Sequence, residues 1–280
     1  MPLMSASKPA DPWIQCPIPK PRASLRLFCF PYSGGSAATY RKWGDVLPDS
    51  IEVCPVQLPG REMRLMEPVF SSVFPLVDAL TPAMVPFLDK PFALFGHSMG
   101  ALVIFELARK LRRERKLLPE CLFPSARVAP GFPLKDRPVS NLPEDELVQE
   151  LIQFNGTEQG VLQDKELLSL ILPTLRADFA LHEEYKYSEE PPLQCPIVVF
   201  GGLQDRDTEE EGLDAWRAHT SNSFAKRMFA GDHFFINSQQ SLFFDGFTQE
   251  LQWAVRNIVA RTTPARVTDK SREAAPDLVH

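Results

Sequence analysis

A serine lies at the centre of the segment Gly96-His97-Ser98-Met99-Gly100, which joins an apolar run to a helical stretch. Residues 91–95 before it are typical of a buried strand, and residues 101–116 after it of an amphipathic helix. A Gly-x-Ser-x-Gly turn in this setting holds its serine on a sharp corner, with the hydroxyl exposed and the positive end of a helix dipole behind it. The pattern predicts that Ser98 is a nucleophile. The alternative is a glycine-rich loop whose serine only caps the next helix.

A serine hydroxyl attacks well only when a base removes its proton, so the sequence must supply a histidine. The chain has five. Four are set aside by position: His97 beside the serine in the turn, His182 and His219 within predicted helices, and His280 at the end of the chain. His233 follows directly after a predicted strand over residues 224–229, which suits the chain order serine, acid, histidine. We therefore predict that His233 is the base.

A carboxylate is needed to orient the imidazole and stabilise its cation. Asp205 follows the apolar run of residues 197–200. The carboxyl end of that strand would bring Asp205 to the edge of the sheet where Ser98 lies, and open α/β sheets bind their ligands at this edge. Asp207 and Asp232 are competitors, for which the alternative role is a helix cap or a solvated turn carboxylate. We predict Asp205 as the acid.

Acyl transfer to serine also needs hydrogen-bond donors for the developing oxyanion, and losing one such donor costs about 3 kcal/mol of transition-state stabilisation. The backbone N–H of Met99 is one expected donor. The second is expected in the loop Phe30-Pro31-Tyr32-Ser33-Gly34-Gly35-Ser36, where the glycines let the backbone bend toward the site. We assign it to the N–H of Ser33. As a phosphate-binding loop, this segment lacks the Gly-Lys-Ser/Thr ending.

The elements that must position these residues alternate between strand and helix along the chain. Strands are predicted over residues 25–30, 51–56, 91–95, 121–129, 195–200 and 224–229, and helices over residues 36–47, 74–88, 101–116, 208–219 and 239–259. Near-continuous apolar strands separated by helices indicate a parallel sheet covered on both faces. Right-handed crossovers then favour a doubly wound α/β fold.

The predicted domain spans residues 23–260, after a proline-rich disordered leader over 1–22 and before a charged disordered tail over 261–280. Residues 131–187 interrupt the alternation with two helical patterns, at 143–154 and 165–182. Their apolar stripes would either complete the core or form a helical lid that lines a channel for an acyl chain.

Composition narrows the class of protein. With 280 residues, a net charge of −6 and a pI near 5.5, the chain lacks the basic surface of a nucleic-acid-binding protein. It has no run of 18 apolar residues and no signal-peptide core, so we expect a cytoplasmic protein without a membrane span. Its five cysteines include no Cys-x-x-Cys pair, which gives a zinc or redox site no support. Four of them lie in or beside predicted strands, where we expect free, buried thiols.

The helix after the serine ends in a cluster of six cations within the eight residues 109–116. On an acidic protein, this basic cluster would suit docking of an acidic partner. Cations near a helix C-terminus also complement the helix dipole and simply face water, and we favour that interpretation.

Five segments, in this order and at this spacing, resemble the type II thioesterases that accompany nonribosomal peptide and polyketide synthases. They are Phe30–Ser36, Gln57-Leu58-Pro59-Gly60-Arg61, Phe95–Ala101, Gly201-Gly202-Leu203-Gln204-Asp205 and Gly231-Asp232-His233-Phe234-Phe235. The resemblance implies an α/β-hydrolase fold and hydrolysis of acyl or aminoacyl thioesters from the phosphopantetheine arm of carrier domains, an editing reaction. It places the triad on Ser98, Asp205 and His233 and the oxyanion donors on Met99 and Ser33. Ser33 stands where the family often has alanine.

Other functions remain open at this stage. One is acyl transfer or cyclisation, in which an alcohol or amine replaces water; another is hydrolysis of medium-chain fatty acyl thioesters. A carboxylesterase or lipase is separated mainly by the motif over residues 58–61, and an inactive scaffold by the presence of all three triad candidates. We expect a monomer that needs no metal and no cofactor of its own, because the carrier protein brings the phosphopantetheine.

Overall fold

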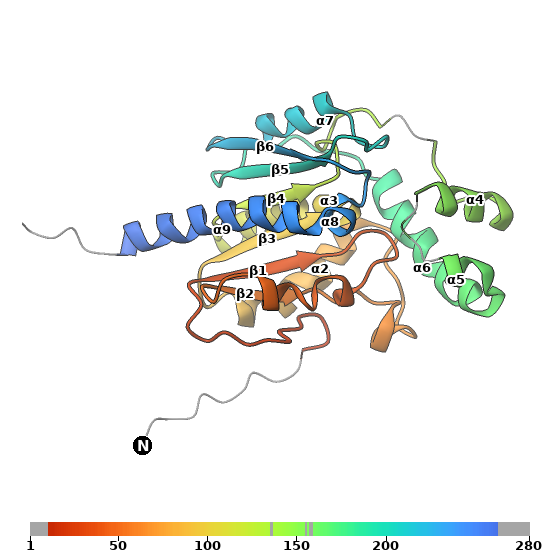
Figure 1. Cartoon of the computed structure of the whole chain (residues 1–280), viewed down its shortest axis with the longest axis horizontal. Helices are drawn as coiled ribbons and strands as arrows, with labels where there is room; N and C mark the ends of the chain where they lie inside the picture. Colours follow the sequence, from red (N-terminus) through yellow and green to blue (C-terminus); the bar gives the residue numbers. More distant parts are fainter. Residues whose placement is uncertain (1–10, 135–136, 155, 157–158, 263–280) are drawn as a thin grey trace, which may run out of the picture.

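The computed structural model describes residues 11–134, 137–154, 156 and 159–262, and in these residues six parallel strands form one sheet in the order β2-β1-β3-β4-β5-β6. The strands are β1 (Leu25–Phe30), β2 (Ile51–Pro55), β3 (Phe92–His97), β4 (Leu122–Ser125), β5 (Ile197–Gly202) and β6 (Phe224–Phe229). Five parallel pairings connect them. The predicted parallel α/β architecture is confirmed, and Figure 1 shows the strands running toward the helices of residues 131–187.

Alternation of side chains along the strands supplies two cores, one on each face of the sheet. In β1, Phe28 and Phe30 enter one core while Leu25, Leu27 and Cys29 enter the other. Every residue of β1 is buried, as a strand covered on both faces requires. The unbroken apolar strands of the sequence are explained by this double burial.

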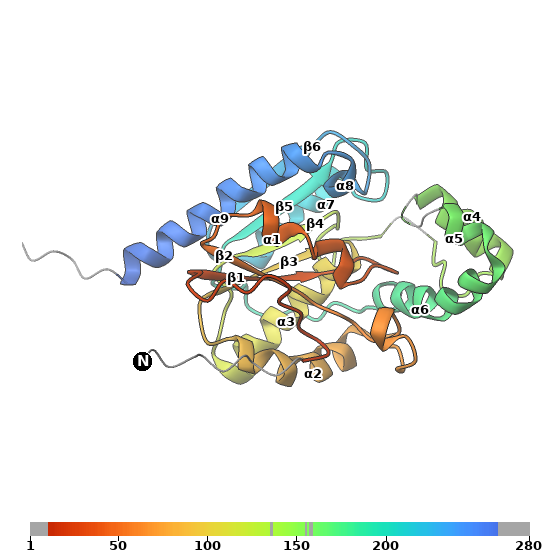
Figure 2. The ribbon, with the colours of Figure 1, turned by 60° about the horizontal axis from the view of Figure 1, so that its bottom comes forward.

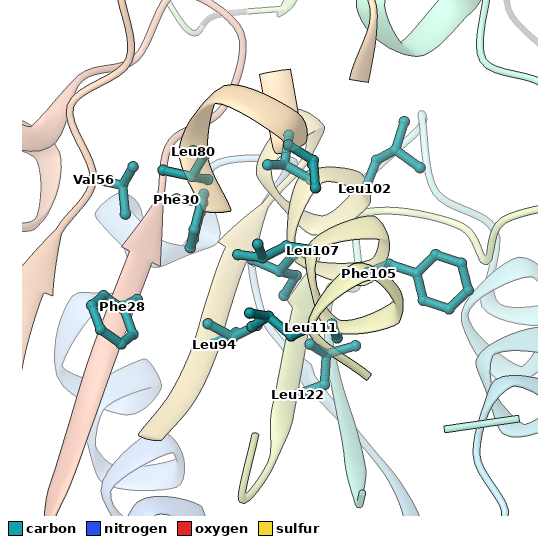
Figure 3. Packing of buried hydrophobic residues seen from close by; sticks show 14 of the residues in the cluster. Phe28, Phe30, Val56, Leu80, Leu94, Leu102, Phe105, Leu107, Leu111 and Leu122 are labelled. Atoms are coloured by element: carbon teal, nitrogen blue, oxygen red, sulfur yellow. The ribbon is translucent and has the colours of Figure 1, made fainter. Parts of the chain in front are cut away.

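Helices cover both faces. The first face carries α2 (Val73–Met84), which continues into η3 (Val85–Phe87), α3 (Met99–Arg115), α7 (Glu210–Asp214) and η4 (Ala215–His219). The second carries η1 (Ala37–Tyr40), α1 (Trp43–Val46), α8 (Phe235–Ser238) and α9 (Gln240–Thr262). Figure 2 shows α9 and α1 on the opposite side of the sheet from α2 and α3. Figure 3 shows leucines of α3 packed onto β3 and β4, with α2 alongside.

No helix in the described ranges has the length and apolarity that crossing a membrane requires.

Residues 131–187 contain α4 (Glu144–Phe154), α5 (Gln159–Gln163) and α6 (Lys165–Glu183), and no strand among those described there. They lie beyond the carboxyl ends of the strands, apart from the sheet layers (Figures 1 and 2). A small core joins α4 and α6 through Leu147, Leu151, Leu168, Leu172, Leu175 and Phe179. We call these three helices the lid.

Several element boundaries differ from the predictions. The helix expected over 36–47 is divided into η1 and α1, because Tyr40 turns inward and donates its hydroxyl to the Phe30 carbonyl at 2.9 Å. The strand expected over 121–129 ends at Ser125, because Ala126 takes a positive φ of 50° that leaves the extended conformation. α5 was not predicted.

The first described residues are not a disordered leader. Ile14 is 3 % exposed and pairs with Val56, and Cys16 forms a disulfide with Cys54 of β2. The prediction of disorder over 1–22 is therefore wrong for residues 11–22; residues 1–10 lie outside the described part. The expectation of a free thiol is wrong for Cys54. The cysteines free and buried are Cys29, Cys121 and Cys195.

At the other end, α9 runs on to Thr262 and so includes the first residues of the tail predicted over 261–280. Residues 263–280 lie outside the described part.

Candidate active site

Ser98 forms the corner between β3 and α3. Its φ of 52° and ψ of −115° are strained for a residue with a Cβ, as a nucleophile elbow requires. The turn is held by the Ser98 N–H, which donates to the Ser125 carbonyl of β4 at 2.8 Å. A Cβ at Gly100 would lie 2.4 Å from the Phe30 carbonyl oxygen, so only glycine lets the start of α3 approach the loop after β1 this closely. The predicted elbow is present.

His233 and Asp205 come together from the loops after β6 and β5. The His233 Nδ1 lies 2.9 Å from the Asp205 Oδ2. An ionised carboxylate only accepts hydrogen bonds, so the proton between them belongs to Nδ1 and the Nε2 of His233 is left with its lone pair. This tautomer is the one that a general base in a serine hydrolase needs.

The structure distinguishes the three candidate carboxylates. Asp207 lies 3.8 Å from the His233 Nδ1, and its side chain is 31 % exposed where that of Asp205 is fully covered. Asp205 also accepts hydrogen bonds from the Thr208 hydroxyl at 2.6 Å and from the Asp207 N–H at 2.9 Å. Asp232 instead accepts from the Phe234 N–H in its own turn. Geometry thus favours Asp205 among the three carboxylates that the chain order allows.

Burial and hydrogen bonding oppose each other in this pair. Burial raises the pKa of Asp205, but the hydrogen bond and charge of His233, with the Thr208 and Asp207 donors, lower it below its ordinary value. Burial lowers the pKa of His233, but the hydrogen bond and charge of Asp205, helped by Asp207, raise it above its ordinary value. The pair therefore favours ionised Asp205 and makes His233 a stronger base.

Two other histidines contact the site. The buried His97 shares a 2.9 Å hydrogen bond with the Ser125 hydroxyl, and its ring packs 5.3 Å from that of His233. Burial and the charge of His233 lower the pKa of His97 to about 3, so it stays neutral beside the base. His182 was predicted to be exposed or satisfied within a helix; instead it lines the chamber described below, and burial lowers its pKa well below the ordinary value. His219 is buried with its Nε2 2.9 Å from the Pro130 carbonyl oxygen, as a core histidine should be.

The loop after β1 presents the Ser33 peptide to the site. The Tyr32 carbonyl accepts a hydrogen bond from the Gly35 N–H at 2.9 Å within the loop. In a planar trans peptide the C=O and the next N–H point in opposite directions, so the N–H of Ser33 faces away from that turn. Ser33 and Ser98 line the same chamber. Met99 is the first residue of α3, where helix N–H groups have no partner within the helix.

An apolar chamber is lined by residues of the lid and by the candidate catalytic residues. Its lining includes Ser98, His233 and Ser33, together with Leu151, Phe154, Leu175 and Phe179 of the lid. Arg127 and His182 add nitrogen atoms to this lining, and burial lowers the pKa of Arg127 to about 10. A second, more polar hollow meets the chamber at His233 and is lined by the acidic Asp205, Asp207 and Asp232. The lid helices thus line a substrate-sized space as well as their own core.

Asp205, Asp207 and His233 place ligand atoms within 4.8 Å of one another, which makes them the group to test as a metal site. The short contact between the His233 Nδ1 and Asp205 needs a proton on that nitrogen, and a metal-bound nitrogen carries none. The other Asp205 contacts are also hydrogen bonds. The arrangement fits an acid–histidine pair and not a metal centre.

The basic cluster lies far from this site and is engaged within the chain. α3 has 17 residues, so its end is about 25 Å from Ser98 at 1.5 Å per residue. Glu190 binds Arg109 at 2.8 Å, Arg112 at 2.8 Å and Arg113 at 2.5 Å. These contacts favour a structural role for the cluster over docking of a partner.

Sequence reasoning missed three supporting contacts. Thr208 fixes Asp205, His97 packs on the His233 ring, and Asp178 of α6 binds Arg61 and the Ser33 loop. The sequence carries a signal only for the first, because an aspartate followed within three residues by a polar turn residue is typical of a turn held by side-chain hydrogen bonds. The other two join segments far apart in the chain, which no local pattern reveals.

Comparisons with known proteins agree with this geometry. The thioesterase domain family matches residues 25–249. Linear gramicidin dehydrogenase LgrE of Brevibacillus parabrevis is 45 % identical over 81 % of this chain and 88 % of its own. Thioesterase PikA5 of Streptomyces venezuelae is 38 % identical over 81 % of each chain.

Among solved structures, the RedJ thioesterase from the prodiginine biosynthetic pathway of Streptomyces coelicolor superposes with a TM-score of 0.78. It is 36 % identical, over 83 % of this chain and 92 % of its own. A serine elbow, an acid–histidine pair and an apolar chamber thus occur in a chain whose match to the family covers nearly the whole sheet and lid. The chain belongs to the thioesterase domain family.

Proposed function

We propose that this protein hydrolyses acyl or aminoacyl thioesters carried on the phosphopantetheine arm of carrier domains, through an acyl-enzyme on Ser98. The observation that carries the proposal is the hydrogen bond of 2.9 Å between Asp205 and His233, beside a chamber that both His233 and Ser98 line. A hydrolase of this kind needs no reagent beyond the thioester and water.

In the acylation step, the Nε2 of His233 takes the proton of the Ser98 hydroxyl as the oxygen attacks the thioester carbonyl. Negative charge develops on the carbonyl oxygen and is stabilised by the N–H groups of Met99 and Ser33. The C–S bond then breaks, and the pantetheine sulfur leaves with the proton that His233 returns. Ionised Asp205 stabilises the imidazolium throughout.

In the deacylation step, His233 removes a proton from water, which attacks the acyl-serine ester. The tetrahedral intermediate uses the same two N–H groups, and its collapse releases the carboxylic acid and restores Ser98. The polar hollow that meets the chamber at His233 gives water a route to the ester while the acyl chain lies among Leu151, Phe154 and Phe179.

The name of the relative LgrE introduces a second activity, that of a dehydrogenase. The sequence contains no Gly-x-Gly, the start of the dinucleotide-binding fingerprint, whereas the loop after β1 reads Pro31-Tyr32-Ser33-Gly34-Gly35. The site described above supplies a nucleophile and a base instead. Thioester hydrolysis is therefore the function that this chain's residues support.

The names of the relatives support thioester hydrolysis in a biosynthetic pathway. RedJ and PikA5 are named thioesterases, RedJ comes from the prodiginine biosynthetic pathway, and LgrE is named for linear gramicidin. We propose that carrier domains of a nonribosomal peptide or polyketide synthase deliver the substrate, and that the enzyme works in the cytoplasm as a monomer.

Incubating the protein with an acyl-phosphopantetheinyl carrier protein and following free thiol tests the proposal. Wild type should release thiol, and Ser98→Ala should reduce kcat by at least about 10³-fold, because loss of the nucleophile leaves only the oxyanion donors and binding. Ser221→Ala is the matched control, since the Ser221 hydroxyl donates to the Leu193 carbonyl and lines neither the chamber nor the polar hollow. A Ser98→Ala variant with wild-type turnover would remove the mechanism. Faster hydrolysis of simple oxygen esters than of carrier thioesters would overturn the substrate assignment.

A further inference from the structure

Arg61 and Asp178 form a buried ion pair between the core domain and the lid. Arg61 lies in the loop after β2, and Asp178 lies in the middle of α6. The guanidinium binds both carboxylate oxygens, with its Nη1 2.9 Å from Oδ2 and its Nη2 2.8 Å from Oδ1. The side chains are 8 % and 3 % exposed. Such fork-to-fork geometry fixes orientation as well as distance.

The same two side chains also hold the loop that contains Ser33. The Gly34 N–H donates to the Asp178 Oδ2 at 2.8 Å, and the Arg61 Nη1 donates to the Gly35 carbonyl at 3.1 Å. The ion pair therefore binds one donor and one acceptor of this loop, on the two residues directly after Ser33. Together with the internal Gly35-to-Tyr32 hydrogen bond, these contacts fix the peptide groups on both sides of Ser33.

α6 also touches the loop directly. Gly34 has a φ of +76°, and a Cβ there would lie 2.6 Å from the Leu175 Cδ2. The residue before Leu175 makes a second contact: the Thr174 hydroxyl donates to the carbonyl of Gly60, beside Arg61, at 2.7 Å. The lid helix is thus bonded to both loops, and the Ser33 loop cannot change conformation without disturbing α6.

We propose that Arg61 and Asp178 are positioning residues for the oxyanion-binding loop, and that through them docking of the lid helix α6 sets the direction of the Ser33 N–H. The inference rests on the proposed function, because it takes Ser33 as an oxyanion donor. It assigns a role to the arginine of the Leu58–Arg61 segment and makes the lid part of the catalytic geometry as well as the wall of the chamber.

The energetics explain why an ion pair suits this task. A loop with two glycines loses more conformational entropy on ordering than other sequences do, so it needs strong contacts to stay fixed. Hydrogen bonds to charged groups are stronger than those between neutral groups, and this pair supplies two to the loop backbone. A donor misplaced by a fraction of an ångström stabilises the oxyanion less while binding of the acyl chain is unaffected.

Asp178→Asn is the first test variant. Both oxygens of Asp178 accept hydrogen bonds, so the amide NH₂ of asparagine would face a donor of Arg61 or of Gly34 in either orientation. The substitution therefore breaks the network with little change in volume. We expect kcat to fall by about 10- to 100-fold, short of complete loss of a donor, with KM changed less than threefold. Removing one partner of a buried pair also destabilises folding, so a second variant is needed.

Arg61→Met/Asp178→Leu is that second variant. Replacing a buried ion pair by apolar residues of similar volume is often neutral for stability, so α6 stays docked while the loop loses both contacts. Arg26→Met/Glu52→Leu is the matched control. This pair is also buried and bonded at 2.7 Å, but joins β1 to β2 near the amino ends of the strands, away from the site. Its kcat should stay within twofold of wild type.

A tetrahedral-state probe separates positioning from a merely structural role. An alkyl trifluoromethyl ketone forms an oxyanion adduct with the serine, so its Kd should rise in Arg61→Met/Asp178→Leu by the factor by which kcat/KM falls. The Kd of a non-hydrolysable thioether analogue of the acyl carrier should change less than twofold. A folded network variant with wild-type kcat, or an equal loss of kcat in the control pair, would overturn the inference.

All variants are also assayed with a p-nitrophenyl ester, whose hydrolysis uses the same oxyanion site. If wild type cleaves this ester but no carrier thioester, the proposed substrate is wrong while the ratio between variants still tests the positioning role. If Ser98→Ala is inactive and both network variants match wild type, the proposed mechanism stands and the positioning role is wrong.

Discussion

At His233, the proposed general base, opposing physical effects set the pH range in which we expect activity. Burial favours neutral His233, while Asp205 and Asp207 favour the protonated form and prevail, so its pKa is raised. In the proposed mechanism, His233 must be neutral to accept the serine proton. Activity should therefore be lost as the pH falls through this raised pKa, at a higher pH than an unperturbed imidazole would give.

Asp205→Asn and Asp207→Asn form a matched pair for this prediction. Asp205→Asn should lower the apparent pKa in the profile of kcat/KM against pH and reduce kcat by about 10³- to 10⁴-fold, because the amide no longer holds the right tautomer. The Asp207 carboxylate lies 3.8 Å from the His233 Nδ1 and is partly exposed. Asp207→Asn should therefore lower the apparent pKa of His233 less, and change kcat by only a few-fold. Stopped-flow assays between pH 5 and 9 measure both. Reversed magnitudes would make Asp207 the acid.

Sequence patterns lead to some of the proposed site residues and not to others. The elbow motif leads to Ser98 through its strand–turn–helix context, and the order of elements along the chain leads to His233. Choosing Asp205 over Asp207 needs the loop conformation, since the two are separated by one residue. The link between Arg61 and Asp178 spans 117 positions, and no pattern in the sequence indicates it.

Among the elements, the lid helices combine two roles that the sequence left as alternatives. Leu151, Leu175 and Phe179 belong to the core that joins α4 to α6 and also line the chamber. A helix stripe wide enough for both contacts looks the same in the sequence as a stripe that only completes a core. The position of the lid over Ser98 decides between them, and it is a tertiary property.

Leu134→Trp tests the chamber as the acyl-binding space. Leu134 lines the chamber and is 50 % exposed, so a larger ring there fills space with little effect on folding. The ratio of kcat/KM for octanoyl to acetyl carrier thioesters should fall by at least about tenfold, because excluding even one methylene can account for this factor. Leu167→Trp on α6, 45 % exposed and outside the chamber lining, should leave the ratio unchanged. Equal ratios in both variants would place the acyl chain elsewhere.

Element prediction succeeded for strands flanked by turns and failed where single contacts decide. β1, which is buried throughout, and β6, whose residues are half-buried or exposed, both have the predicted boundaries. Residues 11–22 lack periodicity, yet Ile14 and Cys16 attach this segment to β2 and its end. An irregular segment held by a few long-range contacts has the same local sequence as a disordered one.

On the scale of the whole molecule, the parallel sheet separates stability from chemistry. The two cores extend along its faces, while the catalytic loops and the lid gather at the carboxyl ends of the strands, as the general rule for such sheets predicts. The basic cluster lies at the far end of α3, and its ion pairs with Glu190 tie the helix to the chain just before β5.

The backbone of Ser98 implies a trade-off between activity and stability. Its φ of 52° costs about 1–3 kcal/mol for any residue with a Cβ. Ser98→Gly should relieve this strain and Ser98→Ala should retain it. Glycine has greater conformational entropy in the unfolded chain, which offsets part of this gain. Ser98→Gly should therefore be more stable than Ser98→Ala by about 1 kcal/mol, or about 2–4 °C in Tm. Differential scanning calorimetry decides, and a less stable glycine variant would show that the corner is unstrained. Both variants should be inactive, so Ser98→Gly would abolish activity and at the same time raise the resistance of the protein to thermal unfolding.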